Sequence, residues 1–359
     1  MLKIIKRPPL AEKKMFILRL MAVVFAIAAS MVIIALLGHN PIKVMIEMVR
    51  GSIGSKYRIS ETINKMVPLL TLSLGVCVAY KMKFWNIGAE GQFYMGAYGA
   101  GVVAFNFGSL PSYLLLPAMF LGGILAGGLW ALIPALLKAK WQTSETLVTL
   151  MLNYVAIRWI TYLQYGPWRD PKAAGLPRMM HFPDAAALPE IGGMHIGWII
   201  ALVLVAFIYI LIRYSKLGYE ITVMGENPRT AEYAGMNTFR ILLIAIMISG
   251  GICGIAGIIQ ATGLEHSISP VLSSGLGFTA IITAWLSKLQ PVSLVSVSFL
   301  FAMMLQGGSY LQSVMKVPSD VAGVIQGVIL FFVLGSEFFT QYKIVWDKRR
   351  DEESRRVDA

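Results

Sequence analysis

Residues 85–92 read WNIGAEGQ and interrupt a region that is otherwise strongly apolar. The stretch lies between Thr62–Tyr80 and Phe93–Phe107, and both of these segments have the composition of membrane spans. Within eight residues it holds two glycines and three polar side chains, namely Asn86, Glu90 and Gln92. An ionisable side chain inside a membrane is costly, so Glu90 is expected either to line a transport path or to have a buried partner.

The composition of the whole chain is that of a membrane protein. Of its 359 residues, 57% are hydrophobic and only 14% are charged, and the mean hydropathy is +0.68. A soluble domain has about a quarter of its residues charged. The net charge of +12 does not indicate nucleic acid as a partner, because the basic residues cluster at the ends of apolar runs. Lipid is the expected surrounding.

Apolar runs of about 17–25 residues predict an all-α polytopic membrane protein with about ten transmembrane helices. Their expected bounds are 15–37, 62–81, 87–107, 112–137, 146–165, 196–213, 240–261, 276–289, 291–308 and 320–341. Together they predict one transmembrane domain over 1–359, with the membrane bundle at 15–341 and a basic cytoplasmic tail at 342–359.

The distribution of Lys and Arg predicts the orientation. With the N-terminus and C-terminus inside, about 20 of the 31 basic residues fall on the cytoplasmic side. Spans two to five then start outside and spans seven to ten start inside, which is the pattern of an inverted repeat.

Two loops between the spans are long. The outer loop Tyr165–Gly197 is rich in proline and is expected to be irregular, with room for one short helix. The cytoplasmic loop 214–238 predicts a surface helix over Pro228–Ala234, because Asn227 suits the N-cap and Gly235 suits the end of a helix. Such a helix is a candidate coupling element.

The role of Glu90 has two interpretations. If Asn86 caps a helix that begins at Ile87, Glu90 falls near its first turn, where a carboxylate stabilises the positive end of the helix dipole. Contact with a transported substrate explains Glu90 equally well. The neutral side chains of Asn153 and Gln260 have the same two interpretations, because they either bridge helices or line a path.

No catalytic or metal-binding pattern is present in the sequence. The phosphate-binding motif G-x-x-x-x-G-K-[ST] does not occur, and the four histidines have no metal-ligand spacing. Cys77 and Cys253 both lie in apolar runs, where packing explains them. The sequence therefore predicts a chain that binds no cofactor and catalyses no reaction itself.

Four segments, in this order along the chain, resemble the permease subunits of bacterial ABC importers of the nucleoside and simple-sugar branch, which is related to branched-chain amino acid and ribose permeases. The segments are GSKYRISETINKMVPLL (54–70), NIGAEGQFYMGAYGA (86–100), SETLVTLMLNYVA (144–156) and GENPRTAEYAGMN (225–237). The resemblance covers about residues 50–340. Residues 80–84, YKMKF, depart from the more neutral stretch of many relatives, which leaves the substrate open.

The resemblance implies an assembly in the bacterial cytoplasmic membrane. Its other members would be a second homologous permease subunit, a cytoplasmic ATP-binding subunit that uses ATP and magnesium, and an extracytoplasmic substrate-binding lipoprotein. ATP binding and hydrolysis in that subunit would drive alternating access. The family's coupling loop falls on Gly225, Glu226, Asn227, Pro228, Ala231, Glu232, Tyr233 and Gly235.

Within that family a nucleoside is the first expectation for the substrate, and ribose or another simple sugar is the alternative. A second alternative is an ion-coupled secondary transporter in which Glu90 carries the coupling ion. A nucleoside path needs aromatic faces and hydrogen-bonding groups, so the expected path residues are Asn86, Glu90, Gln92, Tyr94, Asn153, Gln260 and Phe278.

Overall fold

The computed structural model describes a largely helical chain. Its described residues are 2–6, 12–173, 175, 177–316, 321, 323–325, 327–328, 331–332, 335–336 and 342–346. Most of the tenth predicted span and positions 347–359 of the predicted tail therefore lie outside the described residues. The remaining tail residues, Tyr342–Trp346, form strand β4, which pairs antiparallel with β1 (Leu2–Lys6).

The chain divides into two compact units, residues 1–52 with 307–359, and residues 53–306. The first unit holds α1 (Glu12–Leu36) and nearly all of α2 (Pro41–Ile53), and α2 is bent by 112° from the Val24–Leu36 part of α1. The chain passes from the second unit back to the first within α12 (Pro291–Met315).

The second unit carries the other helices. In chain order they are α3 (Lys56–Lys81), α4 (Ala89–Asn106), α5 (Ser112–Trp141), α6 (Glu145–Tyr165), the 3₁₀ turn η1 (Asp184–Ala186), α7 (Gly197–Tyr214), α8 (Lys216–Glu226), α9 (Pro228–Tyr233), α10 (Thr238–Gln260), the π-helical turn η2 (Ala261–Glu265) and α11 (Leu276–Leu286). A small hairpin of β2 (Glu190–Ile191) and β3 (Met194–His195) precedes α7.

Helices α3 and α10 form the centre of this unit. In their most apolar stretches 83% and 78% of the residues are buried, whereas α5, α6 and α7 bury about a third or less. The outer helices turn apolar side chains such as Leu125, Met151 and Val203 outward, as expected of helices that face lipid. The unit is thus a bundle with two enclosed central helices.

Glycine allows the close contacts between α4, α5 and α10. A Cβ on Gly96 would overlap the backbone of Gly254, and one on Gly254 would lie 2.6 Å from the carbonyl oxygen of Gly123. Small residues let helix backbones approach closely where lipid gives little hydrophobic drive to association. These glycines therefore serve the close packing of α4, α5 and α10.

Six helices of the described residues are long and apolar enough to cross a membrane, or seven if the bent pair in α1 and α2 counts as one span. The chain is therefore a polytopic α-helical membrane protein, while the number ten stays a prediction. One predicted span is wrong in length. Residues 276–289 do not form a crossing helix, because α11 has only 11 residues and is about 16 Å long.

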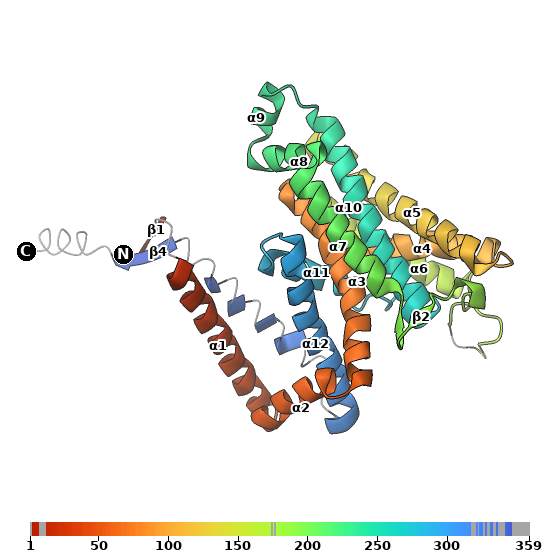
Figure 1. Ribbon diagram of the computed structural model, residues 1–359, viewed down its shortest axis with the longest axis horizontal. Coiled ribbons are helices and arrows are strands. Elements are labelled where there is room, and N and C mark those ends of the chain that lie inside the picture. Colours follow the sequence, from red (N-terminus) through yellow and green to blue (C-terminus); the bar gives the residue numbers. More distant parts are fainter. Residues whose placement is uncertain are drawn as a thin grey trace, which may run out of the picture. The chain divides into compact units, whose positions relative to one another are not determined.

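The long loops lie at opposite ends of the bundle, with α8 and α9 at one end and the β2–β3 hairpin at the other (Figure 1). Segment 214–238 contains two helices, so the prediction of a single one is incomplete. The other loop contains the short 3₁₀ turn η1, in accord with the prediction, and also the hairpin, which the sequence did not suggest.

His195 fixes this hairpin to the bundle. Its ring is buried and packs so closely on Gly197 and Gly263 that a Cβ on either glycine would lie against it. Neither ring nitrogen has a hydrogen-bond partner among the described residues. Burial lowers the pKa of His195 to about 4, so the imidazole is neutral at pH 7 and acts as a packing group.

Candidate functional site

The segment between α3 and α4 enters the bundle as irregular chain. Helix α3 ends at Lys81, Lys83 has a left-handed backbone (φ 57°), and α4 begins only at Ala89. Met82, Phe84 and Asn86 are buried, while Lys83 and Trp85 between them are exposed. The prediction that Asn86 caps a helix from Ile87 is wrong, since Gly88 is the N-cap and donates its N–H to Asn86 Oδ1 at 2.9 Å.

Side chains from three helices hold this irregular segment by hydrogen bonds. Asn86 and Gln92 exchange two hydrogen bonds of 3.1 Å between their amide groups. Asn86 Nδ2 also donates to Ser249 Oγ of α10 at 3.4 Å. From α6, Asn153 accepts the Gly91 N–H and donates to the Ile87 carbonyl, both at 2.8 Å. Buried backbone groups outside a helix need such partners.

Glu90 joins the start of α4 to the start of α11. Its Oε2 accepts hydrogen bonds from Ser273 Oγ and from the Gly277 N–H, each at 2.7 Å. Ser273 Oγ in turn accepts the N–H of Leu276 at 3.0 Å. Glu90 is buried in the first turn of α4, so one carboxyl group lies at the N-termini of two helices, where negative charge is stabilised.

Tyr94, one turn further along α4, holds the same segment. Its hydroxyl donates to the Pro270 carbonyl at 2.7 Å and accepts the N–H of Ser273 at 3.3 Å. The ring is buried, so its polar end serves the protein itself. We call Asn86–Gln92, Ser249 and Ser273–Gly277 the mid-bundle junction.

The junction lies halfway along α10. A Cβ on Gly127 would lie 2.6 Å from the carbonyl oxygen of Gly250 and 3.2 Å from that of Gln92, and Gly250 is near the middle of Thr238–Gln260. Helix α4 therefore starts at mid-height, and Gly277 brings the start of α11 to the same level. With a length of about 16 Å, α11 covers about half of a hydrocarbon core of about 30 Å.

The seven predicted path residues have different surroundings. Five of them are buried and hydrogen-bonded at or next to the junction, namely Asn86, Glu90, Gln92, Tyr94 and Asn153. Gln260 Oε1 is buried without a hydrogen-bond partner among the described residues, and Phe278 is exposed on α11. As contacts for a transported molecule, all seven remain a prediction.

Sequence reasoning missed the partners of Glu90. Ser273 and Gly277 lie in SSGLG (273–277), a run of small residues between two apolar stretches. Such a run marks a break in a helix or a close approach of backbone. A Cβ on Gly277 would lie 2.6 Å from Glu90 Oε2, so glycine is required there.

The helix predicted for the coupling segment agrees closely with α9. Asn227 Oδ1 accepts the N–H of Arg229 at 3.0 Å, Pro228 is the first residue of α9, and Gly235 follows with φ +73°. Ala231 is buried, and Tyr233 is 93% exposed. The cap, the start and the left-handed end are confirmed, while the helix ends at Tyr233, one residue earlier than predicted.

Gly225, at the end of α8, reaches the main bundle. A Cβ there would overlap the Lys81 carbonyl oxygen and lie 3.2 Å from Met82 Cα. The α8–α9 segment thus contacts the first residues of the irregular segment that leads to the junction.

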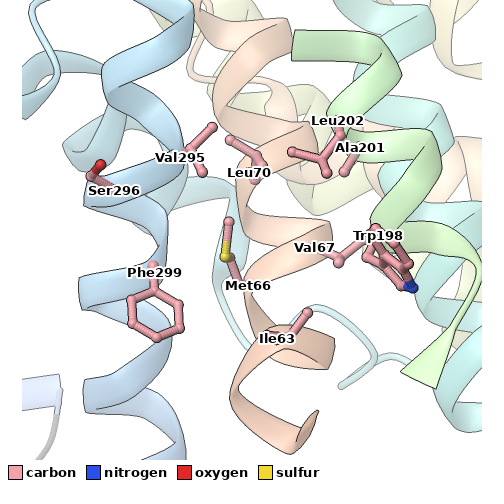
Figure 2. A pocket seen from close by; sticks show the side chains of 10 residues that line it. All are labelled: Ile63, Met66, Val67, Leu70, Trp198, Ala201, Leu202, Val295, Ser296 and Phe299. Carbon is pink, nitrogen blue, oxygen red and sulfur yellow. The ribbon is translucent and has the colours of Figure 1, made fainter. Parts of the chain in front are cut away.

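An apolar groove of about 460 Å³ lies between α3, α7 and α12 (Figure 2). Met66, Trp198 and Phe299 are among its lining residues, and Ser296 carries the single hydroxyl group of the lining. A polar solute would lose its hydrogen bonds to water there without replacement. The groove is therefore no candidate for a sugar or nucleoside site.

The model of the family described as "Branched-chain amino acid transport system / permease component" matches residues 58–334. The chain belongs to this family. The permease is 32% identical to the glucose ABC transporter permease protein TsgB13 of Haloferax volcanii, over 92% of its own length and 91% of that protein. It is 29% identical to the guanosine ABC transporter permease protein NupP of Bacillus subtilis, over 88% and 92% of the two chains.

A third relative is the nucleoside ABC transporter permease protein NupB of Lactococcus lactis, at 27% identity over 88% and 89% of the two chains. The resemblance to ABC importer permeases is confirmed. The permease is a multi-pass protein of the cytoplasmic membrane and a transport component.

Proposed function

We propose that the permease forms half of the membrane pathway of an ABC importer and moves a nucleoside inward by alternating access. The observation that carries this proposal is the capped, protruding α9 in a chain that matches ABC permeases over about nine-tenths of its length. An ion-coupled carrier has no need of such a helix, and Glu90 has a structural partner in α11. ABC import is therefore favoured over ion coupling.

The proposed assembly has four kinds of member. A second, homologous permease completes the membrane part, an ATP-binding subunit with ATP and magnesium docks at the α8–α9 end, and a lipoprotein delivers cargo at the hairpin end. The proposal also keeps both termini in the cytoplasm, as the distribution of Lys and Arg predicts. The residues proposed for ATPase docking are the exposed ones of the coupling segment, Glu226, Asn227, Pro228, Glu232, Tyr233 and Gly235, with Ala231 and Gly225 holding it to the bundle.

Two similar half-structures support the proposed inverted repeat within one transmembrane domain. Each enclosed helix, α3 and α10, is followed by an irregular segment and then by a helix that starts at mid-height, α4 and α11. Inverted repeats with broken helices are a common plan among transporters, with cargo handled near the membrane midplane.

Two cargo classes remain to be separated by experiment. Two relatives are named for nucleosides or guanosine, whereas the 32% identical relative is named for glucose, which favours a simple sugar as the second candidate. We expect proteoliposomes holding the complete importer to take up labelled guanosine when ATP is supplied at the ATPase side, and unlabelled glucose not to compete. Uptake of glucose alone would assign the sugar, and ATP-dependent uptake of neither would contradict the proposed function.

The docking role of α9 is tested by cysteine crosslinking. We expect Tyr233→Cys to crosslink to the ATP-binding subunit in the assembled importer, because this side chain is exposed at the tip of the helix. The matched control is Ala231→Cys, two residues away and buried, which should not crosslink. Equal yields from both variants, or none from Tyr233→Cys in an intact complex, would contradict docking at α9.

A further inference from the structure

Helix α11 and the residues just before it leave one face exposed. Ser274, Phe278 and Trp285 are all exposed, while Gly277, Ala280 and Ala284 of the same segment are buried. Phe278 and Trp285 are seven residues apart, so they lie on one face of α11 about two turns from each other, and Ser274 lies just before the helix begins. The stripe starts at the mid-bundle junction and ends near Lys288.

The irregular segment before α4 adds a second indole to this stripe. The rings of Trp85 and Trp285 are stacked, with centroids 5.5 Å apart and an interplanar angle of 26°. Tyr80 lies beneath both, with its centroid 5.5 Å from that of Trp85 and 5.8 Å from that of Trp285. Tyr80 is buried, whereas both indoles are about half exposed. We call Ser274, Phe278, Trp285 and Trp85 the aromatic stripe.

The depth of the stripe decides what it faces. Val271 and Ser274, in the irregular chain before α11, are exposed at the level of Glu90, halfway through the bundle. Non-helical backbone at this depth is tolerated only where protein buries it or where it lines a water-filled cavity, because hydrocarbon offers no hydrogen bonds. Residues 53–306 do not cover the side chains of Val271 and Ser274. A stripe that borders water, or a partner that encloses water with it, fits irregular chain at this depth.

We propose that the aromatic stripe lines the α8–α9 half of the transport path and stacks against the flat face of the passing molecule. The inference rests on the proposed function and names the residues that contact the cargo. Stacking on indole rings suits a nucleobase through its π-face and a sugar through its C–H face, and it is weak enough to allow release. Ser274 adds a hydroxyl group at the start of the stripe, where its Oγ already donates to the Val271 carbonyl at 3.0 Å.

Cysteine labelling tests whether water reaches the stripe, without knowledge of the cargo. Single variants Ser274→Cys and Phe278→Cys in the complete importer are treated with a charged, water-soluble methanethiosulfonate. Native Cys77 and Cys253 are fully buried, so the unmodified importer gives the background. The control is Val203→Cys on α7, an exposed position on an outward-facing apolar surface.

We expect both stripe variants to react about tenfold faster than Val203→Cys, because only a hydrated thiol forms the reactive thiolate. Equal, slow labelling at all three positions would overturn the inference. The indoles would then be an interfacial aromatic belt in contact with lipid.

Transport by Trp285 variants tests stacking. Trp285→Leu is expected to lower ATP-dependent uptake about tenfold, since an aromatic stack with a base contributes about 1–3 kcal/mol, and Trp285→Phe should restore most of it. The matched control is Trp159→Leu on α6, because Trp159 and Trp285 are each 40% exposed and Trp159 also stacks on an aromatic ring, that of Tyr162. Parallel uptake assays with guanosine and with glucose show which of the two solutes depends on the stripe.

The two proposals fail in different ways. If the unmodified importer takes up neither solute, the proposed function is wrong, and labelling alone then decides whether the stripe is wetted. If the unmodified importer is active and Trp285→Leu matches Trp159→Leu, the stripe is overturned while the function stands.

Discussion

Replacing Glu90 by alanine is expected to lower the free energy of unfolding of the permease by about 3 kcal/mol or more and to abolish transport. The change removes the acceptor of the Gly277 N–H and of Ser273 Oγ, which are both buried. A hydrogen bond contributes about 0.5–1.5 kcal/mol net, and each buried donor left without a partner costs about 1–3 kcal/mol in desolvation. Thermal unfolding in detergent and the yield of assembled importer measure the effect.

Glu90→Gln separates the structural role from a role of the charge. The amide oxygen can accept the same two hydrogen bonds, so this variant should assemble and unfold nearly as the unmodified permease does. Glu220→Ala is the control for the loss of a carboxylate elsewhere. Glu220 Oε1 lies 3.7 Å from Lys216 Nζ, and this ion pair should contribute little because the lysine side chain is exposed to solvent. If Glu90→Ala is as stable as Glu220→Ala, Glu90 does not hold the two helix starts together.

The long helices α4 and α10 could be predicted from the sequence within two residues, and the short α11 could not. The expected span 240–261 differs from α10 by one or two residues at each end, because a long apolar run has no alternative in a membrane. Residues 276–289 are also an apolar run, yet α11 starts at mid-height and has only 11 residues. Hydropathy reports the preference for an apolar environment and does not report where the chain turns back, so a half-length helix resembles a crossing one.

The junction could be predicted only on one side. The cost of an ionisable group in a membrane indicated a buried partner for Glu90, and the structure supplies one. That partner, Ser273, is 183 residues away, and no local pattern connects the two positions. By contrast, the Asn227 cap of α9 depends on neighbouring residues alone, so its chemistry could be recognised directly in the sequence.

Replacing Gly225 by valine is expected to lower ATP-dependent uptake about tenfold or more while the importer still assembles. No Cβ fits between Gly225 and the Lys81 carbonyl, so a side chain must push α8 away from the end of α3. Overpacking of this kind costs about 1–3 kcal/mol. The displaced contact is the one that joins the coupling segment to residues 82–88, and hence to Trp85 and the start of α4. Uptake and ATP hydrolysis, measured on the same proteoliposomes, report whether the two remain coupled.

Tyr219→Val is the matched control, because Tyr219 is exposed on the same helix and lies outside the residues proposed for docking. It should leave uptake near normal. In Gly225→Val the crosslink of Tyr233→Cys to the ATP-binding subunit should persist, because α9 keeps its own cap. ATP hydrolysis should continue without proportionate uptake.

Normal uptake by Gly225→Val would contradict this prediction. Movement of the ATP-binding subunit would then reach the mid-bundle junction by another route, such as the contacts of α8 and α9 with α10. Loss of both the crosslink and uptake would instead mean that Gly225 positions α9 for docking and transmits nothing by itself.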